Sequence, residues 1–189
     1  MWLYRTSGEA EHQIVLYDYQ RDRKYTHPET FLKDFSGFLH TDGYDGYHKL
    51  PDRITVVGCW AHLRRKFDEA LQTLPKEKRE SSDAAKGIAY CDRLFHFEKQ
   101  FALLSPEERR KKREQLSKPL TEAFFAWADS FRALPKFLLG KAASFCVPSQ
   151  RDEWNFRRGY LDMTAANLDS QGTFVNGAVF GLCKLCPPV

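Results

Sequence analysis

Asp42 is the residue of this chain best placed to take part in chemistry. It follows the apolar stretch "GFLHT" (37–41) and opens onto two Gly-Tyr steps, "GYDGY" (43–47). A strand that ends on a carboxylate and turns at once holds that acid at the rim of a sheet. Mg²⁺ takes carboxylate oxygens, and phosphoryl-transfer sites place such acids at strand ends. Asp42 is therefore a candidate metal ligand, with a plain turn built on Asp42 and Asp45 as the alternative.

A basic cluster lies in "CWAHLRRKF" (59–67), at the start of an expected helix. Arginine side chains and helix N-termini both suit phosphate oxygens. A second basic run, "RRKKR", occupies 109–113. A solvated helix face is the favoured interpretation of this second run, and an exposed basic helical turn is the alternative for the first cluster. The candidate phosphate-binding residues of the first cluster are His62, Arg64, Arg65 and Lys66.

A zinc site is a further alternative. Cys59 and His62 have the spacing of half such a site, and "CKLC" supplies Cys183 and Cys186. The two halves are far apart in the sequence and Cys59 ends an apolar strand, which favours an ordinary buried thiol. A structural zinc protein is thus the weaker hypothesis.

The elements that must position these residues change in kind along the chain. Aromatic and β-branched runs come first, and amphipathic helical runs follow from Trp60. The order strand, helix, strand, strand predicts an α/β domain with one mixed sheet. We expect a hairpin over 1–19, a helix over 29–36, a strand ending near Asp42, a strand over 54–58, and helices over 60–72, 83–104, 105–116 and 120–134.

The composition sets limits on the class of protein. A chain of 189 residues with 42% hydrophobic content can bury a sizeable core. The net charge of +4 is compatible with a polyanionic partner. No apolar run is long enough to cross a bilayer and no signal peptide is evident, which indicates a cytoplasmic protein without a membrane partner. The motifs of nucleotide-cofactor enzymes and serine hydrolases are absent from the sequence.

The order of the motifs carries more information than any one of them. "HPETFLKDFSGFLHTDGYDGYHKL" (27–50), "CWAHLRRKFDEAL" (59–71) and "LLGKAASFCVPSQRDEW" (138–154) resemble the catalytic domain of the insertion sequence 66 family of transposases, over about residues 1–162. This resemblance implies a DDE transposase with a ribonuclease H-like fold. Two Asp and one Glu would bind two divalent metals, Mg²⁺ or Mn²⁺, that drive cleavage and joining of DNA at the element's terminal inverted repeats. Asp42 matches the second acid.

The resemblance also implies a chain that is incomplete at both ends. The family's first Asp lies upstream of the segment that matches "MWLYRT", and its Glu aligns near Ser170, beside Asp169. Two missing acids predict an inactive fragment, unless Asp169 replaces the Glu. The domains implied are the N-terminal part of the catalytic domain (1–75), a helical insertion (76–138), a return to the catalytic domain (139–165) and a divergent, out-of-frame tail (166–189).

Partners and location follow from the same resemblance. DNA is the expected partner, with His62, Arg64, Arg65 and Lys66 near the acids, and the nucleoid of a bacterial cytoplasm is the expected location. A missing first strand would leave an unpaired sheet edge, which predicts self-association. A nucleic-acid-binding module without catalysis is the alternative; its affinity would fall steeply with salt and would not depend on metal.

Overall fold

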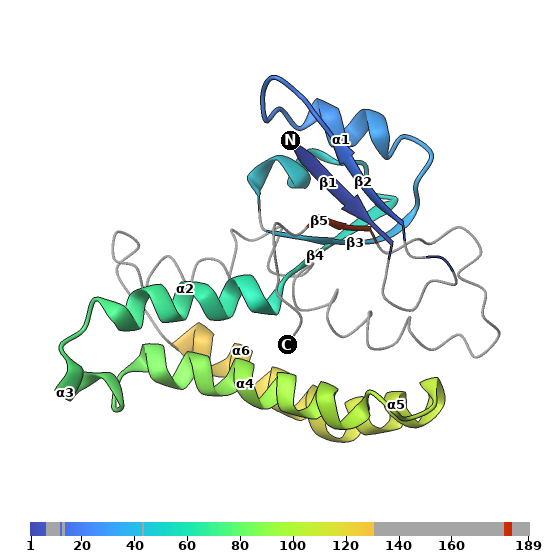
Figure 1. Cartoon of the computed structure of the whole chain (residues 1–189). Helices are drawn as coiled ribbons and strands as arrows, with labels where there is room; N and C mark the ends of the chain where they lie inside the picture. Colours follow the sequence, from blue (N-terminus) through green and yellow to red (C-terminus); the bar gives the residue numbers. More distant parts are fainter. Residues whose placement is uncertain (7–11, 13, 43, 131–179, 183–189) are drawn as a thin grey trace. The chain divides into compact units, whose positions relative to one another are not determined.

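The computed structural model describes residues 1–6, 12, 14–42, 44–130 and 180–182. The chain separates into two units, one made of Met1–Cys59 with Gln171–Val189 and one of Trp60–Ser170 (Figure 1). The helix that follows Cys59 groups with the later helices. The segment 139–165, the tail apart from 180–182, and Ser170 and Asp169 lie outside the described residues.

The first unit opens with the predicted hairpin. Strand β1 (Trp2–Arg5) pairs antiparallel with β2 (Val15–Asp18), with Trp2 opposite Asp18 and Arg5 opposite Val15. β1 alternates, burying Trp2 and Tyr4, whereas the side chains of Val15, Leu16 and Tyr17 on β2 are exposed. One strand of the hairpin therefore faces the core and the other forms its outer edge.

Helix α1 (Thr26–Phe31) begins earlier and ends earlier than the helix expected over 29–36. Pro28 sits inside its first turn, where the backbone N–H groups have no partner within the helix and a proline is tolerated. Gly37 starts the next strand with a φ of 135°. Only glycine adopts that conformation readily.

A second sheet follows, with the strand order β4-β3-β5 and parallel pairing throughout. Its strands are β3 (Gly37–Thr41), β4 (Ile54–Gly58) and β5 (Phe180–Leu182), and the 3₁₀ helix η1 (Asp45–Lys49) lies between the first two. β3 and β4 confirm the predicted strands. Around them the core of the unit comprises Trp2, Tyr4, Leu32, Phe35, Leu39, Tyr47, Leu50 and Ile54.

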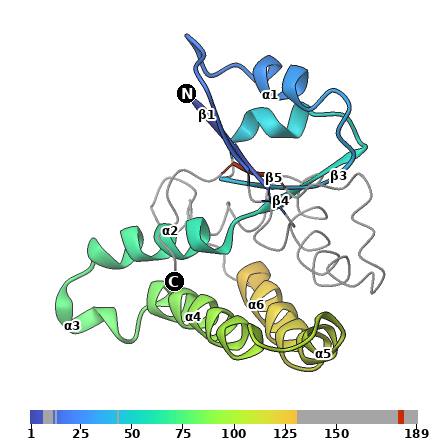
Figure 2. The ribbon, with the colours of Figure 1, turned by 45° about the vertical axis from the view of Figure 1, so that its right-hand side comes forward.

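One expectation about the sheet was wrong. Among the described residues the hairpin and β3 do not belong to one hydrogen-bonded sheet. Strand β5 bonds to the second edge of β3 and contacts β1, so that it lies between β1 and β3 in both views (Figures 1 and 2). The physical reason is that free N–H and C=O groups on a strand edge bind any extended segment within reach.

The second unit is helical. Its elements are α2 (Trp60–Gln72), α3 (Lys76–Arg79), α4 (Asp83–Phe101), α5 (Pro106–Lys112), the π-helical turn η2 (Arg113–Ser117) and α6 (Lys118–Ser130). α2 has the bounds that the sequence predicts. α4 ends before residue 104, and the helix expected over 105–116 is α5 continued by η2.

Local sequence signals explain where these helices begin. The Ser82 side chain accepts a hydrogen bond from the Ala85 backbone N–H at the start of α4. Ser105 and Glu108 form a capping box at the start of α5, with Pro106 in the first turn. Each cap satisfies backbone donors that the helix itself leaves without a partner.

The helices enclose an aromatic core. α4 and α6 run side by side in both views (Figures 1 and 2), and α2 packs on α4. The Trp60 and Phe124 rings lie edge to face with centroids 5.1 Å apart. The buried members of this core are Trp60, Leu63, Phe67, Cys91, Leu94, Phe124 and Phe125.

Candidate functional site at the end of strand β3

Asp42 lies where the sequence places it, directly after β3. The preceding Thr41 is buried, and the Asp42 side chain is 18% exposed. β3 is the central strand of the parallel sheet, between β4 and β5. The carboxyl ends of parallel strands are where open α/β sheets bind their ligands. Asp42 is therefore at the rim of a sheet and within reach of solvent.

The tyrosines of the two Gly-Tyr steps form an aromatic cluster next to this acid. The rings of Tyr44 and Tyr47 lie edge to face with centroids 5.5 Å apart, and Trp2 contacts both. Burial, and then the negative charge of Asp42, raise the pKa of the Tyr47 hydroxyl above its ordinary value. A Cβ at Gly46 would overlap the Tyr44 ring. The tyrosines thus pack the turn, and Gly46 makes room for one of them.

Asp42 both forms a turn and presents a charge. Its Oδ1 accepts a hydrogen bond from the Tyr44 backbone N–H at 3.3 Å, which is the turn that the sequence offered as the alternative. Its Oδ2 accepts one from Arg23 Nη2 at 3.0 Å. The acid is thus already paired with a cation.

Arg23 is a site residue that the sequence reasoning missed. Its guanidinium lies over the Tyr44 ring, 4.6 Å from the centroid, and its carbonyl accepts a hydrogen bond from the Tyr44 hydroxyl. The available signal was weak: Arg23 stands in a charged segment, "QRDRKY" (20–25), that has no periodic pattern.

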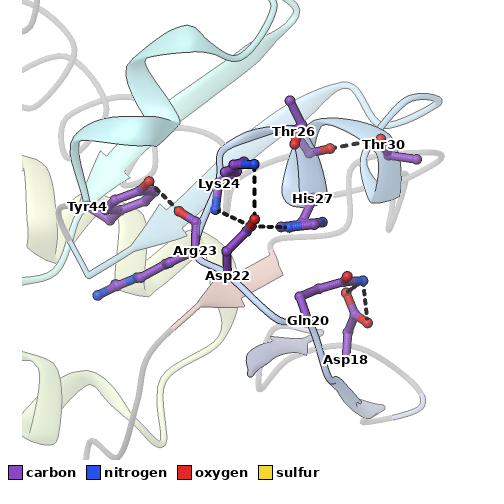
Figure 3. Close-up of polar contacts among 9 residues, drawn as sticks. All are labelled: Asp18, Gln20, Asp22, Arg23, Lys24, Thr26, His27, Thr30 and Tyr44. Atoms are coloured by element: carbon purple, nitrogen blue, oxygen red, sulfur yellow. Dashed lines mark hydrogen bonds and ion pairs between the residues drawn. The ribbon is translucent and has the colours of Figure 1, made fainter.

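Asp22 fixes the segment that carries Arg23. Its carboxylate accepts from the Lys24 backbone N–H at 3.1 Å, pairs with Lys24 Nζ at 3.1 Å and lies 2.7 Å from His27 Nε2 (Figure 3). The hydrogen bond with His27, followed by those with Lys24, lowers the pKa of Asp22 from 3.8 to about 2. This network joins the segment after β2 to the first turn of α1.

A hollow of about 280 Å³ opens beside these residues. Both acids and two arginines line it, so its charges are nearly balanced. The lining residues include Trp2, Gln20, Arg21, Asp22, Arg23, Asp42 and Tyr47. Its two carboxylates offset the charge of its two arginines.

The residues described do not fit a two-metal centre. Among them no three His, Cys, Asp or Glu side chains come together in a way that could hold a metal ion. Asp42 contributes a single carboxylate, one oxygen of which is bound to a guanidinium. For the zinc alternative, Cys59 is buried, and Cys183 and Cys186 lie outside the described residues.

Two members of the predicted phosphate-binding cluster have partners within the helical unit. Arg64 donates two hydrogen bonds to the Asp92 carboxylate, which join α2 to α4 and raise the pKa of Arg64. Lys66 Nζ lies 3.1 Å from Glu69 Oε2 on the same helix.

The other two members differ in exposure. Arg65 is exposed, whereas His62 is half-buried. Arg65 is therefore the member of the cluster best exposed for contact with a partner. The cluster and Asp42 belong to different units.

The basic run 109–113 also has partners within the helical unit. Arg113 pairs with Glu98 of α4, Lys111 Nζ lies 3.0 Å from Glu107 Oε1, and Arg110 Nε lies 3.8 Å from Glu114 Oε1. This run therefore lies on a helix face whose charges are paired within the unit. The sequence favoured a helix face over phosphate binding for it.

Comparison with known proteins identifies the class of protein. Residues 1–170 match the family described as "Transposase IS66 family". The match covers most of the chain, and the chain belongs to this family. The resemblance stated from its motifs is thereby confirmed. No helix of the described residues is long and apolar enough to cross a membrane.

Two curated relatives come from Sinorhizobium fredii (strain NBRC 101917 / NGR234). "Uncharacterized protein y4hP" is 32% identical over 152 residues, which cover 71% of this chain and 27% of that protein. "Uncharacterized protein y4qI" is 35% identical over 80 residues, which cover 35% of this chain and 15% of that protein. The chain thus spans about a quarter or less of the length of these relatives. No solved structure matches it significantly.

Proposed function

We propose that this chain is part of a transposase that cuts and joins DNA at the terminal inverted repeats of an insertion sequence. The observation that carries the proposal is a carboxylate, Asp42, at the carboxyl end of a central parallel strand in a chain of a transposase family. Support comes also from the net charge of +4, which suits a polyanion. The place of action we propose is the nucleoid of the bacterial cytoplasm.

The finer proposal concerns fold and mechanism. The parallel pair β3–β4 and the neighbouring hairpin support a ribonuclease H-like catalytic domain, and the helical unit supports an insertion within it. Asp42 would be one acid of a DDE set. The cofactor we propose for the complete set is Mg²⁺ or Mn²⁺, which supplies positive charge at a reacting phosphate. The other acids would lie outside the residues described here.

Arg65 is the cluster residue that we propose for contact with the DNA backbone. It is exposed, whereas Arg64 and Lys66 are engaged with Asp92 and Glu69. A contact of this kind carries no sequence information and weakens as salt displaces it.

Mutation of the acid in a longer family member tests the proposal. Replacing the residue that matches Asp42 by Ala should lower strand transfer on terminal DNA by about a thousandfold or more, because a preorganised charge acts mainly on the transition state. Binding of the same DNA, measured by gel shift, should persist.

The residue that matches Asp45 supplies the matched control. It begins η1, is exposed, and should tolerate Asn with strand transfer intact. Full strand transfer after loss of the Asp42 equivalent would remove this acid from the catalytic set.

A nucleic-acid-binding module without catalysis is the second candidate. It is favoured by one observation, that no cluster of metal-ligating side chains occurs among the described residues. The two candidates differ in how DNA affinity responds to Mn²⁺ once salt is held constant. A pure binding module would show the salt dependence and no specific response to the metal.

A further inference from the structure

We propose that the outer edge of β2 is an interface at which two copies of this chain pair, strand against strand, into a closed dimer. The interface lies within the first unit and joins the β1–β2 hairpins of the two copies into one antiparallel sheet. This inference goes beyond the proposed function and does not depend on it.

The apolar side chains along β2 are exposed to solvent. Tyr17 is 67% exposed and Tyr19 is 78% exposed, and the exposed fractions of Ile14, Val15 and Leu16 lie between 44% and 50%. Because consecutive residues of a strand point to opposite faces, neither face of β2 is fully covered. Lysine, proline and bulges usually keep an edge strand from pairing, and β2 contains none of them.

The backbone of β2 has a free edge as well. Among the described residues β2 pairs only with β1, in a continuous register. The Thr6 N–H donates to the Ile14 carbonyl at 3.0 Å, so the Ile14 carbonyl points toward β1. Because this orientation alternates along an antiparallel strand, Leu16 also bonds toward β1, and the N–H and C=O groups of Val15 and Tyr17 point away from it.

One register lets two copies satisfy these outward groups. When Leu16 of one copy lies opposite Leu16 of the other, Val15 lies opposite Tyr17, and each such pair exchanges backbone hydrogen bonds. A β-branched residue facing an aromatic one is a favourable cross-strand pair. Asp18 then faces Ile14 of the second copy, whereas a register centred on Asp18 would bring two like charges together.

The arrangement of the hairpin favours a second copy as the occupant. β1 has β2 on one side and contacts β5, so β2 provides the outward edge of the hairpin. An isologous contact uses the same patch on both copies and closes at two.

The exposed area indicates a reversible dimer. With an aromatic side chain counted at about 200 Å², Tyr17 and Tyr19 together expose roughly 300 Å² per chain. The half-exposed aliphatic neighbours add to this area, against about 800 Å² that each partner buries in a stable complex. We expect a dissociation constant of about 10–100 μM.

Sedimentation equilibrium of the 189-residue chain under reducing conditions tests the pairing. Tyr17→Pro removes an outward N–H and no bond to β1, and proline is tolerated at such positions of edge strands. It should raise the dissociation constant by about tenfold or more, because each copy loses an intermolecular hydrogen bond. Tyr17→Val is the matched control: it keeps the N–H and a β-type side chain and should raise the constant by about threefold or less.

A disulfide between the two copies tests the register. The Cα atoms of directly opposite residues that do not bond to each other lie about 4.5 Å apart, within the span of a disulfide. Under mild oxidation, Leu16→Cys should therefore give a dimer in which mass spectrometry finds position 16 of one copy joined to position 16 of the other. Ile14→Cys is the matched control, because the two copies of this residue would lie more than about 10 Å apart.

Each outcome supports or refutes the interface. A chain that stays monomeric at about 500 μM refutes it, as does growth past the dimer or a Tyr17→Pro chain that dimerises as tightly as the wild type. Equal linkage at positions 14 and 16 refutes the register. If Tyr17→Pro loses amide protection along β1, its hairpin is damaged and the disulfide decides: linkage at position 16 alone supports the pairing, and no linkage refutes it. The proposed function is unaffected by any of these results, since the paired residues lie outside the candidate site.

Discussion

Asp22 illustrates how a single carboxylate can order the segment beside a site. It contacts both the backbone and the side chain of Lys24 as well as the ring of His27. These contacts favour its charged form and lower its pKa to about 2. Arg23 stands between Asp22 and Lys24 in the sequence. The conformation of this loop, and with it the position of the Arg23 side chain, therefore depends on the charge of Asp22.

Acid should therefore loosen this loop. Because the pKa of Asp22 lies lower in the folded chain than its ordinary value of 3.8, the stabilisation is complete above about pH 4 and is lost as the pH falls toward 2. NMR shifts of the Lys24 and His27 amides, followed from pH 5 to pH 2, should report the loss. Asp22→Asn has no charge to lose and should flatten this transition; an unchanged pH profile in that variant would contradict the assignment.

Some site residues could be predicted from the residues next to them in the sequence, and others could not. Asp42 could be predicted, because the apolar run before it and the Gly-Tyr steps after it mark the end of a strand. Arg23 could not, since its partner lies 19 residues away and is brought close only by the packing of the unit. Arg64 was expected to contact phosphate, and no local signal indicated that Asp92 would pair with it.

Elements with strong periodic patterns were the most predictable. The bounds of α2 agree with the sequence because Leu63, Phe67 and Ala70 mark one buried face. α1 was placed less accurately, over 29–36 instead of Thr26–Phe31. In the structure Pro28 lies within the first turn, and Gly37 supplies a left-handed φ at the start of β3.

The packing of α2 on α4 depends on a glycine. A Cβ at Gly87 would lie 2.7 Å from atoms of the Phe67 ring, closer than carbon atoms approach in proteins. Gly87→Ala should destabilise the helical unit by about 1–3 kcal/mol, although alanine at an exposed helix position would stabilise it by about 1 kcal/mol. Thermal or urea unfolding measures the difference.

Relief of the clash provides the control for this prediction. Adding Phe67→Leu to Gly87→Ala should recover part of the lost stability, because the smaller side chain makes room for the new methyl group. Lys99→Ala, at an exposed position of the same helix, should change stability by less than about 0.5 kcal/mol. A more stable Gly87→Ala chain would show that α2 and α4 are further apart than described.

At the scale of the whole molecule, the pairing of strands that are far apart in the sequence could not be predicted. The family and the mixed α/β class could be recognised from ordered motifs and from the change from β-type to helical patterns. The partner of β3 could not be predicted, because Phe180–Leu182 lies far downstream and is too short to show a strand pattern. Strand pairing depends on which backbone groups are free after the rest has folded.

The bond between β3 and β5 yields the last prediction. β5 pairs Gly181 with His40 and lies against β1, so it protects an edge of β3 that would otherwise expose backbone donors and acceptors. Gly181→Pro removes one N–H from this short strand and places a ring in its ladder. Amide exchange at those of Leu39, His40 and Thr41 that bond toward β5 should then accelerate by about tenfold or more, while the amides of β4 keep their protection.

Gly181→Ala is the control, because it adds a side chain without removing the backbone N–H. It retains the N–H and should keep the protection of β3. The proline variant should in addition self-associate more readily in sedimentation experiments, since an unpaired strand edge is a template for a second chain. If the proline variant keeps full protection along β3, then pairing with β5 is not what protects this edge in solution.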